Sequence, residues 1–376
     1  MFSEYNFKNF NFRLLFYALA LNAIGLLVIN SAVNGDRSYI NRQLIGLFGG
    51  LVIMFFLALT DYHKLMRCTG VIYLGCVVIL LAIIVAGQFG GAGTGARRWI
   101  TLPVIGRFQP SEFVKIGLII FFSWFLQRNQ EKINNLRTLI IVGAFAAVPL
   151  LLIMKQPDLS TSIVIVFIIV CLIFVAGLSY KWIIGAAAVG IPGLALTVFL
   201  AERDAVPFLT GYQVNRILAF VNPGKYADLN VQQDNSKMAI GSGMLYGKGL
   251  LNETAISVKN GNFLSEEHTD FIFAVIGEEM GFVGCMLVLV LYLLFVFECL
   301  RMAGRTRDLT GKLLCTGIAA LVGFQAFTNI AVATGIFPNT GLPLPFISYG
   351  VSSLVSLYIG IGVLLNVGLQ QNKLEF

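Results

Sequence analysis

The chain has 376 residues, of which 57% are hydrophobic and only 12% are charged, and its mean hydropathy is +0.83. These values exclude an ordinary soluble globular domain. The formal net charge of +7 could suggest a nucleic-acid partner. The basic residues, however, lie in short loops beside apolar runs and not along one face, so membrane topology explains them better and we expect no nucleic-acid binding.

Uncharged apolar runs recur along the chain, and each is close to the roughly 20 residues that cross a bilayer as a helix. Because the backbone finds no water in lipid, these runs must be helices. In chain order the predicted spans cover residues 12–31, 44–59, 69–86, 113–126, 138–153, 159–177, 182–200, 271–297, 313–335 and 351–368. The sequence therefore predicts an all-α integral membrane protein. We expect one domain over residues 1–376, a single bundle of about ten transmembrane helices.

Lys and Arg residues concentrate in every second short loop, for example in residues 64–67, 128–137 and 301–312. By the positive-inside rule this side is cytoplasmic, and an even number of spans places both termini there. The opposite side carries a large extracytoplasmic loop before the eighth helix, residues 201–270. Since roughly 70 residues exceed an ordinary connection, and their composition is not of low complexity, we expect this loop to be functional.

The predicted eighth span contains two carboxylates well away from its ends, Glu278 and Glu279. An ionisable side chain within the membrane is costly, and it indicates function by default. A polar contact between helices would explain either residue equally well.

Asp270 lies where the long outer loop enters this span. A carboxylate or a threonine at a helix start, here Asp270 or Thr269, ordinarily caps the helix. Glu266, Glu267 and His268 stand directly beside it. Several proton-carrying groups at the boundary between water and lipid favour the alternative that Asp270 is a general base.

The fourth span opens with the run Gln-Pro-Ser-Glu, in which Glu112 has an ordinary first-turn position. Lys115 follows three residues later on the same face, and a local ion pair is the simpler explanation. Because Arg97 and Arg98 lie in the preceding loop, the alternative is a cationic pocket for a phosphate group. The sixth span has a similar start, where Asp158 fits a helix cap.

Several runs, taken together and in this order, are similar to the signature segments of one family. They are Arg98-Trp99-Ile100, Phe108-Gln109-Pro110-Ser111-Glu112, Gln156-Pro157-Asp158-Leu159, Ser236-Lys237-Met238-Ala239-Ile240-Gly241-Ser242-Gly243, His268-Thr269-Asp270-Phe271, Gly277-Glu278-Glu279-Met280-Gly281 and Leu344-Pro345-Phe346-Ile347-Ser348-Tyr349-Gly350. The chain resembles the SEDS family of shape, elongation, division and sporulation proteins, and within it the RodA branch more than the FtsW branch.

The resemblance implies a bacterial peptidoglycan glycosyltransferase of the cytoplasmic membrane. Such an enzyme polymerises lipid II, an undecaprenyl-diphosphate-linked disaccharide peptide, at the outer face, together with a class B penicillin-binding protein. The resemblance also implies that Asp270 is the catalytic residue. It further implies that Glu112, Lys115 and Asp158 line or support a central cavity.

A mechanism follows from these residues. Inverting transfer needs a base for the acceptor hydroxyl, which we expect to be Asp270, and it needs positive charge on the departing diphosphate. Arg97, Arg98 and Lys115 would supply that charge, with Glu112 orienting Lys115. Phosphate chemistry also suggests Mg²⁺ or Mn²⁺, although no ligand pattern for a metal is present. The predicted substrate-binding residues further include Asp158, Lys248, His268 and Ser348, with Glu278 and Glu279 in supporting roles.

Two other functions fit the same sequence. A lipid II flippase would place polar groups near the membrane midplane, whereas nearly all the polar motifs here lie at the outer edge, Glu278 and Glu279 being the exceptions. A noncatalytic scaffold for a penicillin-binding protein would make the outer motifs packing elements.

Overall fold

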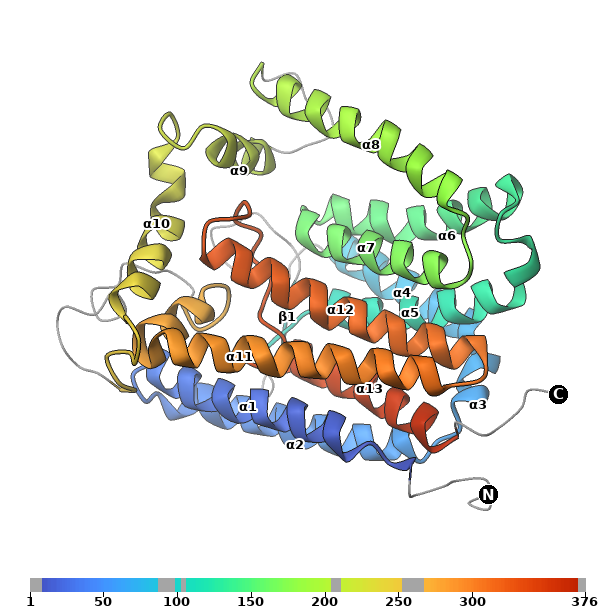
Figure 1. Cartoon of the computed structure of the whole chain (residues 1–376), viewed down its shortest axis with the longest axis horizontal. Coiled ribbons are helices and arrows are strands. Elements are labelled where there is room, and N and C mark those ends of the chain that lie inside the picture. The colour runs from blue at the N-terminus through green and yellow to red at the C-terminus, as the bar shows by residue number, and fades with distance from the viewer. Residues whose placement is uncertain (1–8, 87–98, 103–105, 204–210, 252–266, 371–376) are drawn as a thin grey trace.

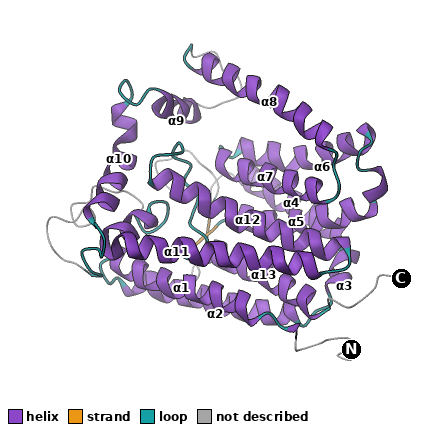
Figure 2. Cartoon of the chain, viewed as in Figure 1, coloured by secondary structure: helices purple, strands orange, loops and turns teal. Residues whose placement is uncertain are grey.

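The computed structural model describes residues 9–86, 99–102, 106–203, 211–251 and 267–370. Helices dominate it (Figure 2). Those that coincide with the predicted spans are α1 (Phe12–Ala32), α2 (Arg37–Ala58), α4 (Thr69–Ala86), α5 (Pro110–Arg128), α6 (Leu136–Lys155), α7 (Leu159–Val175), α8 (Tyr180–Ala201), α11 (Ile272–Arg305), α12 (Leu309–Ala333) and α13 (Val351–Leu369). The predicted helical membrane bundle is confirmed.

Seven of these helices are long and apolar enough to cross a membrane, judged by length and composition over the described residues, and α4 and α7 are shorter apolar helices. The exact number that crosses stays a prediction. The remaining elements are α3 (Tyr62–Arg67), a short 3-10 helix (Gln130–Lys132), α9 (Gly211–Val221), α10 (Ala227–Ser242) and an antiparallel pair of strands, β1 (Ile100–Leu102) and β2 (Gly106–Phe108). The described part of the predicted loop 201–270 thus contains two helices.

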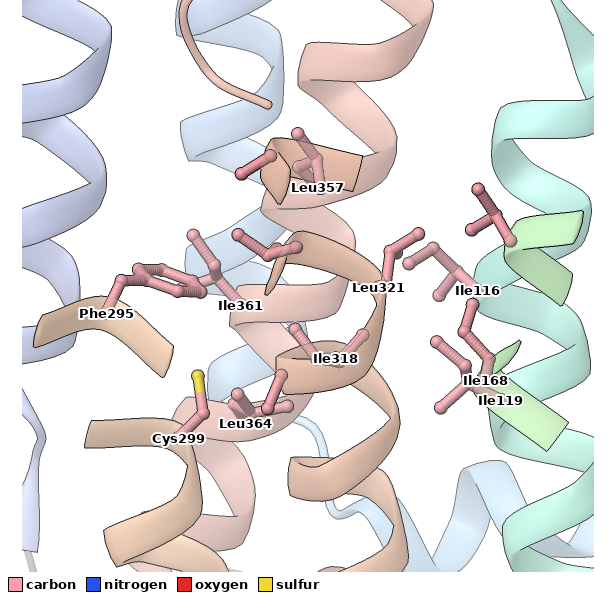
Figure 3. Packing of buried hydrophobic residues seen from close by; sticks show 14 of the residues in the cluster. Ile116, Ile119, Ile168, Phe295, Cys299, Ile318, Leu321, Leu357, Ile361 and Leu364 are labelled. Atoms are coloured by element: carbon pink, nitrogen blue, oxygen red, sulfur yellow. The ribbon is translucent and has the colours of Figure 1, made fainter. Parts of the chain in front are cut away.

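The bundle is built around α12 and α13, whose residues are mostly buried. In Figure 3 apolar side chains from α5, α7, α11, α12 and α13 meet in this core, for example Ile119, Ile318 and Ile361. Helix α8 is the opposite case, since no residue of its most apolar stretch is buried inside the protein. In Figure 1 it lies apart from the other spans. Helices α9 and α10 stand at one end of the bundle (Figure 1).

Helix α5 is buried on nearly every side. Its first two turns carry Glu112 and Lys115, both of which are buried inside the protein. A membrane helix with charged residues is tolerable when those residues face the protein interior and pair with each other. This explains why α5 can belong to the bundle despite its polar start.

The connection between α12 and α13 folds back into the bundle. Phe346 and Ile347 are almost completely buried, and the Tyr292 hydroxyl of α11 donates a hydrogen bond to the Pro345 carbonyl. Helix α1 approaches this connection at Gly25, where an added Cβ would lie 2.7 Å from the Cα of Ile347. A backbone neighbour cannot move away as a side-chain tip can, so only glycine fits this contact.

We expect Gly25→Ala to lower the free energy of unfolding by about 1–3 kcal/mol, because it overpacks a backbone contact. Gly49→Ala in α2 is the matched control, since no atom lies within 4 Å of its added Cβ. There the gain in helix propensity should raise stability by about 0.5–1 kcal/mol. Thermal unfolding of both purified variants in detergent measures the difference. Equal effects would contradict the close approach of α1.

Candidate functional site

The residues before α11 are held by their backbone carbonyls. Three consecutive carbonyls, those of residues 268 to 270, accept hydrogen bonds from residues between 329 and 349. The bonds run from the Tyr349 N–H to His268 (2.9 Å), from the Ser348 hydroxyl to Thr269 (2.6 Å) and from the Asn329 amide to Asp270 (2.8 Å). Because three adjacent peptides are fixed, the backbone that carries the Asp270 side chain is held in place.

The Asp270 carboxylate lies against the α12–α13 connection at Gly341. An added Cβ on Gly341 would be 3.1 Å from Oδ2 of Asp270 and 4.0 Å from Nη1 of Arg216. Gly341 has φ of +70°, a backbone conformation that disfavours any side chain. A carboxylate and a guanidinium from separate elements therefore flank one glycine, and neither side chain is fully buried.

The expectation that Thr269 or Asp270 is the cap of this helix is wrong. The cap position is occupied by Phe271, whose side chain makes no capping hydrogen bond. The bonds to the three preceding carbonyls hold this segment as a turn up to Phe271, so the helix starts later than the capping pattern predicts.

His268 sits in an aromatic group. Its ring centroid lies 5.2 Å from that of Tyr39 at the start of α2 and 5.7 Å from that of Tyr349. The two tyrosine rings are 5.0 Å apart in an edge-on arrangement. These contacts place His268, two residues from Asp270, between α2 and the start of α13.

Ser348 uses its hydroxyl twice within the protein. It donates to the Thr269 carbonyl and accepts from the Leu344 N–H at 2.8 Å. We expect Ser348→Ala to reduce stability by about 1–3 kcal/mol, because both backbone groups lose a partner. The control is Ser242→Ala, where the lost bond lies within the exposed end of α10. Unfolding measurements would contradict this structural role if both variants were equally stable.

The starts of α5, α7 and α13 are joined by hydrogen bonds. Asp158 caps α7, as its position predicts, by accepting from the Thr161 N–H at 3.1 Å, and it also accepts from the Gln109 amide at 3.3 Å. The Gln109 N–H donates to the Ser352 hydroxyl of α13 at 3.0 Å. These bonds bring helices that are distant in sequence together at one end of the bundle.

Two further bonds extend this network. The Ser160 hydroxyl of α7 donates to the Thr340 carbonyl, directly beside the glycine that contacts Asp270. The Gln43 side chain of α2 bonds both the Ser348 carbonyl and the Gly350 N–H, at 3.4 and 3.1 Å. The surroundings of Asp270 are thus fixed by α2, α7, α12 and α13.

Glu112 and Lys115 form the predicted ion pair, with Nζ of Lys115 2.8 Å from Oε1 of Glu112. The side chain of Lys115 has no exposed surface, and that of Glu112 is 4% exposed. The local pair is therefore confirmed, but it is a buried pair and not a surface one. In this conformation Lys115 is enclosed by the protein.

Lys248, Glu278 and Glu279 lie together at a second place, along α11. Lys248 pairs with Glu278 at 2.7 Å, and the Ser31 hydroxyl of α1 donates to Glu279 at 2.6 Å. Both glutamates therefore make polar contacts between separate elements of the protein, and these contacts account for carboxylates inside a span.

Arg97 and Arg98, predicted to bind phosphate, lie outside the described residues. Among the residues that the structure does describe, no three His, Cys, Asp or Glu side chains come together as metal ligands. The described residues therefore do not supply a cation site built from three such protein ligands.

Comparison with known proteins identifies the family. The model of a family described as cell cycle protein, which groups FtsW, RodA and SpoVE, matches residues 12–373. The chain belongs to this family. It is the SEDS family that the motifs indicate, so the resemblance is confirmed.

Two relatives illustrate the similarity of this SEDS protein. Probable peptidoglycan glycosyltransferase FtsW of Geobacter sp. (strain M18) is 34% identical over 378 residues, covering 96% of this chain and 97% of its own. Peptidoglycan glycosyltransferase MrdB of Escherichia coli (strain K12) is 34% identical over 366 residues, covering 96% and 94%.

Solved structures agree with the fold. A chain from a study of polymerization and crosslinking by a peptidoglycan synthase complex has a TM-score of 0.80 at 29% identity, covering 97% of this chain and 99% of that one. Thermus thermophilus rod shape determining protein RodA has a TM-score of 0.69 at 27% identity, covering 97% and 98%.

Sequence reasoning missed three residues of this SEDS protein, namely Arg216, Asn329 and Gln43. Arg216 lies in α9, the most strongly amphipathic of the described helices. An arginine on an amphipathic helix within the predicted functional loop is a sequence feature that could have identified Arg216 as a candidate site residue. Asn329 and Gln43 each bond two backbone groups of the site region, and nothing local in their sequence distinguishes them from other polar residues inside a span.

Proposed function

We propose that this SEDS protein polymerises lipid II into glycan strands at the outer face of the bacterial cytoplasmic membrane. It is a multi-pass membrane protein of the inner membrane and a peptidoglycan glycosyltransferase, as its family and its named relatives support. Lipid II joins an apolar tail to a diphosphate and a polar sugar-peptide, so its reacting bond lies at the membrane surface. The polar motifs of this protein gather at one end of the bundle.

Asp270 is the proposed general base. The observation that carries this role is the combination of a fixed backbone with a carboxylate that is only partly buried. A base must be held in place and still reach the acceptor hydroxyl. Asp270 would take the proton of that hydroxyl as its oxygen attacks the anomeric carbon of the donor sugar, and the lipid diphosphate would leave with inversion.

Positive charge near the departing diphosphate is the second requirement. Arg216 supports this role because its guanidinium flanks the same glycine as Asp270. Lys115 can contact the diphosphate only after a local change, since it is paired with Glu112 and its side chain is buried. A direct contact requires the diphosphate to join or replace Glu112 as its partner. Arg97 and Arg98 stay predicted phosphate ligands.

Three of the other predicted substrate-binding residues have contacts that favour a supporting role. Ser348 and His268 are engaged in fixing the segment before α11, and Asp158 caps α7 while holding the start of α5. We propose that these three residues shape the site and that they contact lipid II through their exposed atoms only.

We propose that a class B penicillin-binding protein is the partner that crosslinks the new strands. The similarity to a chain from a peptidoglycan synthase complex supports a partner of this kind. Both termini are proposed to be cytoplasmic. In support, Asn9 lies just before α1 and beside Gly368, which is near the end of α13. The start of α1 and the end of α13 are therefore at the same end of the bundle.

One experiment separates the proposal from its rivals. The purified full chain, with its penicillin-binding partner, is given lipid II in detergent, and glycan strands are resolved by gel electrophoresis. In parallel, the movement of labelled lipid II across vesicles containing the protein is measured. Strand formation that depends on this chain supports the polymerase. Flipping without polymerisation would support a flippase, and neither activity would support a scaffold.

A further inference from the structure

Helix α11 is interrupted near its outer end. Gly281 has φ of 65° and ψ of −162°, which is not helical, although the helix continues on both sides. In an unbroken helix the N–H groups of residues 282 and 283 would donate to the carbonyls of residues 278 and 279. The break removes this arrangement, and in a membrane protein each unsatisfied backbone group costs several kcal/mol.

The segment 244–249, which follows α10, replaces the missing partners. The N–H groups of Phe282 and Val283 donate to the carbonyls of residues 244 and 245, at 2.9 and 3.1 Å. In return the N–H groups of residues 248 and 249 donate to the carbonyls of Glu278 and Glu279, at 2.9 and 3.0 Å. The four groups released by the break are therefore all bonded to one segment.

Glycines make this close approach feasible. An added Cβ on Gly247 would collide with the Glu279 carbonyl, and one on Gly281 would collide with the Gly247 nitrogen. Gly247 and Gly281 also have φ values of +79° and +65°. The glycines of the 244–249 segment and of the break thus fit each other.

Side chains add to the backbone contacts. The side chain of Lys248, 22% exposed, pairs with that of Glu278, 2% exposed, which lies three residues before the break. Ser31 at the end of α1 donates to Glu279 and accepts from the Leu251 N–H at 2.9 Å. The Lys248–Glu278 pair thus joins the 244–249 segment to the part of α11 that lies outside the break.

We propose that Lys248 and Glu278 are positioning residues for Asp270. The part of α11 from Ile272 to Met280 is a short rod of about 13 Å with Asp270 at its outer start. Since the break separates this rod from the rest of α11, its direction depends on its packing against neighbouring elements such as α10 and on the polar contacts at its two ends. Asn329 holds the Asp270 end, and the 244–249 segment with Lys248 holds the other. The inference rests on the proposed role of Asp270.

The test uses the full chain with its penicillin-binding partner and lipid II as the probe. Lys248→Met and Glu278→Gln should each lower kcat about ten- to hundred-fold, because a misplacement near 1 Å at the reacting atoms has an effect of this size. The KM for lipid II should change less than about threefold if neither side chain binds substrate. Lys248→Arg, which keeps the charge, should retain most of the activity.

The decisive variants alter both residues. In the double variant Lys248→Met with Glu278→Gln, kcat should be no lower than in the worse single variant, because both changes break one interaction. The charge exchange Lys248→Glu with Glu278→Lys should recover at least part of the lost rate. Should the exchanged protein fail to fold, the neutral double variant still decides, since independent residues would give multiplied losses.

Three outcomes would overturn the proposal. One is a wild-type kcat in Lys248→Met, and another is a raised KM in Lys248→Met while Glu278→Gln has no effect, which would make Lys248 a substrate ligand. The third is a rate loss that only follows the folded fraction, measured by thermal unfolding. Asp270→Asn is assayed alongside. If Asp270→Asn is as active as wild type, the proposed function fails, whereas normal Lys248→Met with inactive Asp270→Asn refutes the positioning role alone.

Discussion

Asp270→Asn is expected to lower the rate of lipid II polymerisation by about 10²–10⁴-fold, the usual contribution of a general base. Asparagine is close to aspartate in shape, so the backbone bonds of this segment to Asn329 and Ser348 should persist. What is lost is the group that accepts the proton of the acceptor hydroxyl. The measurement is the initial rate of strand formation by the purified protein with its partner.

Asp234→Asn is the matched control. Asp234 lies on α10, and its side chain, paired with Lys237, is 56% exposed. Its replacement should leave the rate unchanged. Thermal unfolding of both variants shows whether the loss in Asp270→Asn is chemical. A rate near that of the wild type in folded Asp270→Asn protein would remove Asp270 from the mechanism.

Lys115→Met is expected to have the largest effect on stability. It leaves the Glu112 carboxylate buried without its cation, and breaking one partner of a buried pair typically costs about 3–5 kcal/mol. Adding Glu112→Gln to this variant should recover much of the lost stability, because a neutral amide is less costly to bury than an unpaired carboxylate. Chemical unfolding of the single and double variants in detergent measures both effects.

Polymerisation by the same variants separates stability from function. If Lys115 also stabilises the diphosphate, the double variant should be stable and still slow. Lys237→Met is the control for a lost lysine, since its pair with Asp234 is half exposed and should contribute no more than about 1 kcal/mol. Equal losses of stability in Lys115→Met and Lys237→Met would contradict the importance of burial.

The contrast between these two lysine pairs illustrates what sequence patterns can and cannot predict. Both pairs have members three residues apart on one helix, and the spacing alone predicts both bonds. The spacing does not distinguish the buried pair from the exposed one. That difference depends on which helices surround α5, and the sequence of α5 carries no information on its neighbours.

The region of Asp270 gives a second example. Its motif and its place at the start of a span are enough to identify it as a candidate from the sequence alone. The predicted cap is wrong, however, because the three carbonyls that shape the turn are bonded by residues about 60 to 80 positions further along the chain. Arg216 was missed for the same reason, since its proximity to Asp270 exists only in the folded chain.

The sequence by itself determined that this protein is a helical membrane protein, where its long apolar helices lie, and to which family it belongs. These properties depend on local hydropathy and on short motifs, and the cost of exposing the backbone to lipid makes hydropathy decisive. Only the tertiary structure decided that α11 is broken at Gly281 and completed by the 244–249 segment. The physical reason is that the partner of each released backbone group comes from a distant part of the chain, so no local pattern can reveal it.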